Sequence, residues 1–221
     1  MTNHKEVSNN IELALEELFE ELRSGIAARE DSRAFGAMIE KRITDNWIDI
    51  CNKYGYEPVA IPGRRSIFDF ACRVDGKLVG FDVKTKDLNK KSYSDGGVCA
   101  VGNLLKYLAN DKGVFMIVEF GHDKSTEKGG RDLEYIRVAP FHMLPDDIYR
   151  IENLGTGQVR MNYTLNQVWD EIIWDRTNSQ FFDVFCELAI KHYKRVKADA
   201  DKRITSIIKF KENGYAQFKF Y

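Results

Sequence analysis

Two aspartates and a lysine in one short stretch carry the clearest chemical signal in the 221-residue sequence. The apolar run 67–72 contains Asp69, and the apolar run 78–84 contains Asp82 and Lys84. Between the runs, Asp75-Gly76 is the strongest short signal for a two-residue hairpin turn. Folding that hairpin places Asp69 beside Asp82, and strand alternation puts Lys84 on the same face as Asp82.

Two carboxylates and one ammonium at one end of a small sheet suit phosphodiester chemistry. Carboxylate oxygens are the ligands that Mg²⁺ prefers, and one or two of them are enough to hold the ion. A neighbouring lysine can orient an attacking water and offset negative charge on the phosphate. An ordinary surface ion pair between the same three side chains is the alternative reading, and the three residues alone do not decide between them.

The stretch resembles the motif of the PD-(D/E)xK nucleases, with Phe68 where that motif usually has proline. Within this superfamily it is similar to the EcoRV/HincII branch of type II restriction endonucleases. In that branch a helix with an inward-facing glutamate precedes the first motif strand, and Glu40 on the predicted helix 34–54 occupies the matching position. A solvated surface glutamate is the alternative, and the helical periodicity by itself favours it. The resemblance covers roughly residues 35–166.

The resemblance implies a restriction-endonuclease-like α/β (α+β) fold with a mixed central sheet flanked by helices. It implies Asp69, Asp82, Lys84 and Glu40 as catalytic residues, with Asp69 and Asp82 as ligands of Mg²⁺. It also implies cleavage of a short double-stranded DNA sequence by a homodimer. A structure-selective or repair nuclease with the same core, and a non-catalytic DNA-binding protein, are the alternatives.

A polar, glycine-containing region at 148–168 resembles the DNA-reading loop of the same branch. Asn and Gln suit adenine edges and Arg suits guanine. We therefore expect Asn153, Gln158, Arg160 and Asn162 to contact DNA, together with Arg64 and Arg65 just before the first motif strand. An ordinary hairpin at 148–168, and an exposed arginine pair with no partner, are the alternatives.

Composition predicts a soluble globular protein with a single domain over 1–221. Hydrophobic residues make up 43% and charged residues 30%, and the formal net charge is −1. No segment approaches the ~20 apolar residues of a membrane span, and the N-terminus lacks a signal-peptide pattern. The four cysteines form no CxxC pair and favour buried thiols in the cytoplasm.

The remaining elements follow from periodicity. Apolar residues spaced by three and four predict a helix over 10–24, whose seam packs on its own core or, as the resemblance allows, on a twin subunit. We further expect a helix over 98–110, strands over 114–120 and 135–138, a helix over about 179–200 and a closing strand over 215–221. Basic residues gather in the last third and predict a basic surface there.

Overall fold

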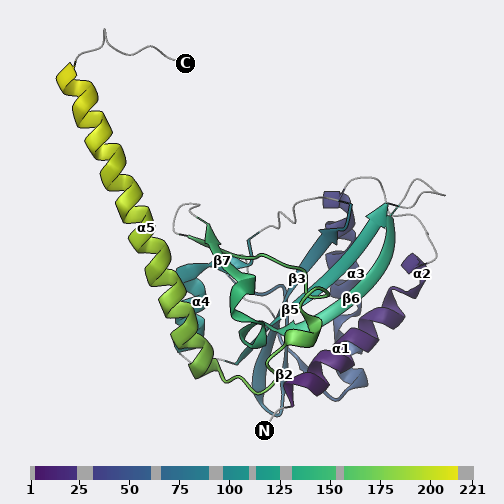
Figure 1. Ribbon diagram of the computed structural model, residues 1–221. Helices are drawn as coiled ribbons and strands as arrows, with labels where there is room; N and C mark the ends of the chain where they lie inside the picture. Colours follow the sequence, from purple (N-terminus) through teal and green to yellow (C-terminus); the bar gives the residue numbers. More distant parts are fainter. Residues whose placement is uncertain are drawn as a thin grey trace.

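The hairpin that the Asp-Gly pair predicts lies at the centre of the fold (Figure 1). The computed structural model describes residues 3–23, 32–60, 66–89, 97–109, 113–124, 131–152 and 157–213. Strands β2 (Phe70–Val74) and β3 (Lys77–Asp87) pair antiparallel. The turn residues Asp75 and Gly76 have φ angles of 51° and 75°, the left-handed conformation that Asp-Gly turns adopt.

The hairpin belongs to a mixed five-stranded sheet in the order β1-β2-β3-β5-β6. Strand β1 (Glu57–Pro58) lies at one edge, and β6 (Arg131–Pro140) pairs antiparallel with β5 (Val114–Lys124) at the other. Strands β3 and β5 are parallel, which requires a crossover, and helix α4 (Val101–Ala109) lies in that connection. The α/β expectation with a mixed, helix-flanked sheet is confirmed.

A second, three-stranded sheet lies beside the first. Its order is β4-β8-β7, with bounds Cys99–Ala100, Gln158–Met161 and Tyr149–Glu152. Strands β7 and β8 form a hairpin within the region that the sequence marks as a DNA-reading loop. Short 3-10 turns surround it at Phe141–Met143, Asp146–Ile148 and Trp169–Glu171.

The two faces of the large sheet cover two separate apolar clusters. Helices α1 (His4–Leu18), α2 (Glu20–Arg23) and α3 (Ser32–Lys53) pack over one face, against side chains such as Phe81 and Val83. Helix α4, the small sheet and the start of α5 (Asn178–Asn213) pack over the other face. Because side chains alternate along β3, Asp82 and Lys84 point to this second side.

The seam of the predicted N-terminal helix is buried inside the chain. The helix is in fact two, because it breaks after Leu18, and Ile11, Leu15 and Leu22 are each less than 5% exposed. Helix α1 lies against β6. Of the two readings offered for this seam, the structure places the apolar side chains in the protein's own core.

Helix α5 is the element that departs most from the expectation. It continues to Asn213 rather than ending near residue 200, and its second half extends away from the rest of the molecule (Figure 1). The expected closing strand at 215–221 lies outside the described residues. Within the described part of the chain, no helix combines the length and apolar character of a membrane span.

Candidate active site

Asp82 and Lys84 form an ion pair in the interior of the molecule. Their side chains project from alternate residues of β3, and Lys84 Nζ lies 2.7 Å from Asp82 Oδ2. Asp82 is only 5% exposed, whereas an aspartate is rarely buried to this extent. The burial of Asp82 beside a single ammonium is therefore not what an ordinary surface ion pair would show.

Asp69 is held next to this pair by the backbone of β3. Its N–H donates to the carbonyl of Phe81 at 2.8 Å, which extends the β2–β3 ladder by one residue. Its Oδ2 accepts a hydrogen bond from the Val83 N–H at 2.8 Å. This second contact fixes the Asp69 carboxylate at the strand position between Asp82 and Lys84, so the predicted convergence of the three side chains is observed.

Glu40 completes the acidic cluster from the opposite side of the sheet. It lies at the solvent side of the cluster, on α3, whose first turns approach β3 where Gly36 faces Thr85. Partial burial raises the pKa of Glu40, the charge of Asp69 raises it further, and Lys84 lowers it. The predicted helix glutamate is thus electrostatically coupled to the three hairpin residues.

The cluster holds more negative charge than Lys84 compensates. Burial raises the pKa of Asp82 to about 7; Lys84 opposes that shift, and Asp69 and Glu40 add to it. Asp82 is buried, whereas Asp69 and Glu40 are exposed, so the negative charge that one ammonium leaves uncompensated is costly mainly at Asp82. A divalent cation beside Asp82 would favour its ionised form, because it supplies the missing positive charge.

The donor set fits a magnesium ion rather than a closed cage. All the donors are hard carboxylate oxygens, which Mg²⁺ prefers, and Mg²⁺ keeps several waters of its own. Across the described residues, no group of three or more His, Cys, Asp and Glu side chains is arranged to hold a metal ion. The hydrogen bond from the Val83 N–H places the Asp69 carboxylate next to Asp82 along β3.

Cys99 borders the site, although sequence reasoning treated it only as one of four buried thiols. It is 7% exposed on β4. Burial raises the pKa of the Cys99 thiol to about 12, and the nearby charge of Asp82 contributes to that rise. No local pattern in the sequence could have placed β4 here. The contact matters because it joins the small sheet to the acidic cluster.

A buried ion pair behind the site was also missed. Lys86 follows Lys84 on the same face of β3 and lies 3.8 Å from Glu119 Oε2 on β5. Lys86 is 2% exposed and Glu119 is fully buried. Glu119 Oε1 accepts hydrogen bonds from Tyr135 Oη at 2.9 Å and from the Leu165 N–H at 2.7 Å. The alternation of residues 82, 84 and 86 was the available signal.

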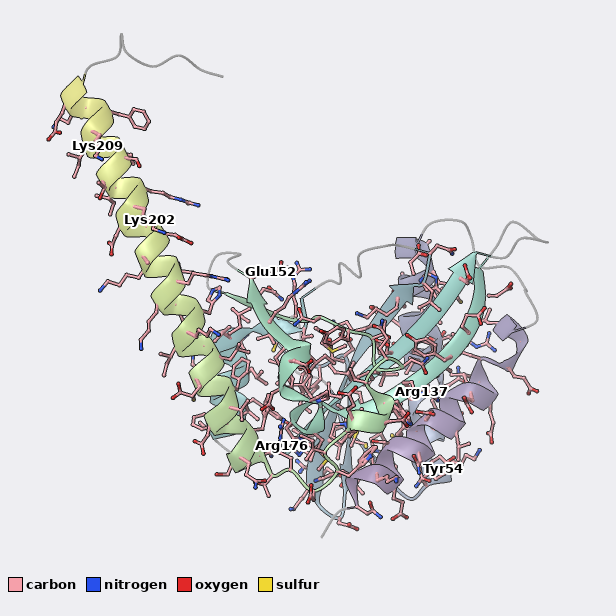
Figure 2. The ribbon with its side chains drawn as sticks, in the orientation of Figure 1. Tyr54, Arg137, Glu152, Arg176, Lys202 and Lys209 are labelled. Atoms are coloured by element: carbon pink, nitrogen blue, oxygen red, sulfur yellow. The ribbon has the colours of Figure 1, made fainter. Side chains whose placement is uncertain are left out.

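The predicted DNA-reading residues that the structure describes are engaged within the chain. Arg160 Nε lies 2.8 Å from Glu152 Oε2, and the Asn162 side-chain amide donates to the Asp147 carbonyl at 2.7 Å. Gln158 packs so closely on Gly97 that an added Cβ there would lie 1.8 Å from the Gln158 amide nitrogen. Figure 2 shows Glu152 near the outer end of β7.

These residues are connected to the acidic cluster through β4. Cys99 pairs with Val159, and Ala100 pairs with Gln158. The hairpin β7–β8 therefore flanks the site on the side opposite to α3. Arg64, Arg65 and Asn153 lie outside the described residues.

No protein-family model matches the chain, and no curated protein matches it either.

Proposed function

We propose that the protein is a Mg²⁺-dependent endonuclease of the type II restriction kind. In this proposal it hydrolyses phosphodiester bonds at a short double-stranded DNA sequence, as a homodimer in the cytoplasm. One observation carries the proposal: Asp69, Asp82 and Lys84 converge at one place on β2 and β3, with Asp82 buried and ion-paired to Lys84. A surface ion pair would not require a buried aspartate or a carboxylate fixed by the neighbouring backbone.

Each residue has a definite role in this proposal. Asp69 and Asp82 hold the metal ion, and Glu40 adds a third negative charge at its solvent side. When bound, Mg²⁺ polarises a phosphate oxygen and lowers the pKa of a coordinated water. Lys84 keeps its ammonium against the Asp82 carboxylate, where it can orient the attacking water and offset charge on the scissile phosphate.

The hairpin β7–β8 is proposed to carry the DNA contacts. It adjoins the acidic cluster through β4, and its side chains Gln158, Arg160 and Asn162 are of the types that read base edges. Arg64, Arg65 and Asn153 complete the proposed DNA-binding set on sequence grounds. Arg160 and Asn162 would exchange their present partners, Glu152 and the Asp147 carbonyl, for DNA.

A structure-selective nuclease is the second candidate, and the same contacts favour it. A side chain that already has an intramolecular partner gains less from a base, because that partner must be given up. If Arg160 and Asn162 keep their partners, they cannot discriminate between sequences. The hairpin would then support the site without reading the DNA.

The test is incubation of the purified protein with several plasmids and Mg²⁺. Discrete bands at reproducible positions support sequence-specific cleavage, and sequencing of their ends gives the target. Cutting confined to branched or mismatched substrates supports the second candidate. Absence of any Mg²⁺-dependent cutting would refute both and favour a non-catalytic DNA-binding protein.

Reading by the hairpin is tested separately by Arg160→Ala and Asn162→Ala. Each variant should reduce the preference for the target over other DNA by roughly 10-fold or more, since a good bidentate contact contributes about 1–3 kcal/mol of discrimination. Unchanged selectivity in competition binding would remove the hairpin from that role.

A further inference from the structure

From Ile190 onward, α5 presents an exposed apolar stripe to solvent. Ile190 is 46% exposed, Ile204 is 55% and Ile207 is 63%. In its first half the same helix contributes Phe181 and Phe185 to the core, both fully buried. The body therefore fixes one end of the helix, while its other end extends away from the body with large apolar side chains exposed (Figure 1).

The spacing of this stripe is that of a two-helix coiled coil. Steps of four and three alternate without a break through eight positions: Cys186, Ile190, Tyr193, Lys197, Ala200, Ile204, Ile207 and Lys211. We call these eight residues the α5 seam. Six of these eight positions carry Cys, Ile, Tyr or Ala and two carry Lys, and a mostly apolar 4-3 repeat over more than three heptads favours a helical partner on that side of the helix.

The first turns of the seam already lie in a groove. Leu105 of α4 and the seam residues Cys186, Ile190 and Tyr193 line an apolar hollow of about 480 Å³, whose walls also include Lys194 and Lys197. The groove continues into the exposed seam. A helix laid along the seam would have its end seated between α4 and α5.

The seam is self-complementary when two copies of it run antiparallel. With a two-fold axis between residues 197 and 200, Ile190 faces Ile207 of the second copy and Tyr193 faces Ile204. Each seam lysine then faces a small residue, because Lys197 meets Ala200 and Lys211 meets Cys186. In a parallel pair each lysine would face its own equivalent, and like charges in a seam are unfavourable.

Charges beside the seam agree with the antiparallel arrangement. Lys194 and Asp201 each directly follow a seam residue, and the same two-fold axis brings Lys194 of one copy opposite Asp201 of the other. The seam with its flanking residues would bury on the order of 1,000 Å² in total, the lower limit for a specific interface. Outward-facing positions carry Lys202 and Lys209, which Figure 2 shows on the extended part of the helix.

We propose that α5 is the dimerisation element, and that its occupant is the α5 helix of a second copy running antiparallel. The carboxyl ends of β3 and β5 point toward the same end of the molecule as the extended part of α5 (Figure 1). The two-fold axis crosses α5 near residue 198. The body of the second copy therefore lies beyond the extended end of the first copy's α5. This interface does not depend on the nuclease proposal, because oligomeric state is measured without DNA.

Sedimentation of the full chain gives the first test. The parent protein should be a dimer, and the variant with both Ile204→Gln and Ile207→Gln should be a monomer at the same concentration. Its dissociation constant should rise at least about 100-fold, because the two substitutions in two copies remove four apolar side chains from the interface. Lys202→Ala with Lys209→Ala is the matched control on the outward face and should remain dimeric. A monomeric parent at about 50 µM, or a dimeric double-Gln variant, overturns the proposal.

Orientation is tested by cross-linking to the native Cys186. Lys211→Cys should give a disulfide-linked dimer on oxidation with copper phenanthroline, because positions 186 and 211 face each other. Lys209→Cys points outward and should give none, and neither should the parent chain. Cross-linking of the parent through Cys186 would indicate a parallel pair and overturn the antiparallel arrangement, as would equal yields from the two cysteine variants.

Charge exchange and vesicle binding complete the design. Lys194→Asp and Asp201→Lys should each weaken the dimer, and the two together should restore it, which only the antiparallel pair predicts.

A basic amphipathic helix can also lie on a membrane surface. Binding of a monomeric parent to vesicles of anionic phospholipid, abolished by Ile204→Gln with Ile207→Gln, would reassign the seam to a membrane and overturn the dimer.

Discussion

At the scale of single residues, the site is defined by a carboxylate held where it is costly to ionise. Burial raises the pKa of the Asp82 carboxyl, the Lys84 ammonium opposes that rise, and the charges of Asp69 and Glu40 add to it. Functional sites concentrate such perturbed groups, since a binding or catalytic role is what retains an unfavourable arrangement. We therefore expect the ionised Asp82 carboxylate to lower the stability of the folded protein, although activity requires it.

Asp82→Asn tests this trade-off through the pH dependence of stability without divalent cations. The ordinary pKa of 3.8 is raised to about 7 in the folded protein, so the folded state binds a proton that the unfolded state has lost between these values. The parent consequently loses stability as pH rises from about 4 to 7, and the asparagine variant does not. We expect the variant to be more stable by about 4 kcal/mol at pH 8 and nearly equal in stability near pH 4.

Urea unfolding of parent and variant at pH 4, 6 and 8 measures the difference directly. A difference that is the same at all three pH values would mean that Asp82 ionises as an ordinary carboxylate. Its burial would then have no electrostatic consequence, and the description of an undercompensated acidic cluster would be wrong.

At the scale of elements, the β2–β3 turn determines whether the two aspartates meet. Gly76 has a φ of +75° and nothing within 4 Å of an added Cβ, so Gly76→Ala changes only the backbone preference. We expect a loss of about 1 kcal/mol. Gly102→Ala is the matched control, because it lies in α4 with equally open space and should instead gain about 0.5 kcal/mol. Equal effects of the two substitutions would contradict this reading of the turn.

The buried Lys86–Glu119 pair ties the two sheets together behind the site. Glu119 receives hydrogen bonds from Tyr135 in the large sheet and from Leu165 in the segment that follows β8. Glu119→Gln removes the charge that faces the buried Lys86 ammonium and should cost about 3 kcal/mol of unfolding free energy. Asp45→Asn, in the exposed Lys41–Asp45 pair, is the control and should cost less than about 0.5 kcal/mol.

Thermal or urea unfolding of these two variants gives the comparison. A loss at Glu119 no larger than that at Asp45 would show that the buried pair is not what holds the second sheet against β3 and β5.

Elements could be predicted from the sequence where the signal is local. The Asp-Gly turn and the 3.6-residue period of α3 depend on neighbours within a few positions, and both are found in the structure. Cys99 beside Asp82 and Glu119 beside Lys86 join residues far apart in the chain. Such contacts depend on how strands pair, and a single sequence does not specify that pairing.

At the scale of the whole molecule, the chain divides into a body and an extended helix. The body combines two sheets with an apolar cluster on each face of the larger one, and the acidic cluster lies on the β2–β3 hairpin, with Cys99 of β4 near Asp82. The sequence indicated a basic last third, but the length of α5 was underestimated. The core-facing residues of α5 lie mainly within 179–200, whereas the seam spacing continues to Lys211.

The central claim is that the cluster of Asp69, Asp82 and Lys84 hydrolyses phosphodiester bonds with Mg²⁺. Its most direct test is plasmid cleavage by the parent, Asp82→Asn and Lys84→Ala, with DNA binding measured in parallel in Ca²⁺. We predict Mg²⁺-dependent cutting by the parent, a rate at least about 1,000-fold lower in both variants, and binding within a few-fold of the parent. Cutting by both variants at near-parental rates would contradict the account.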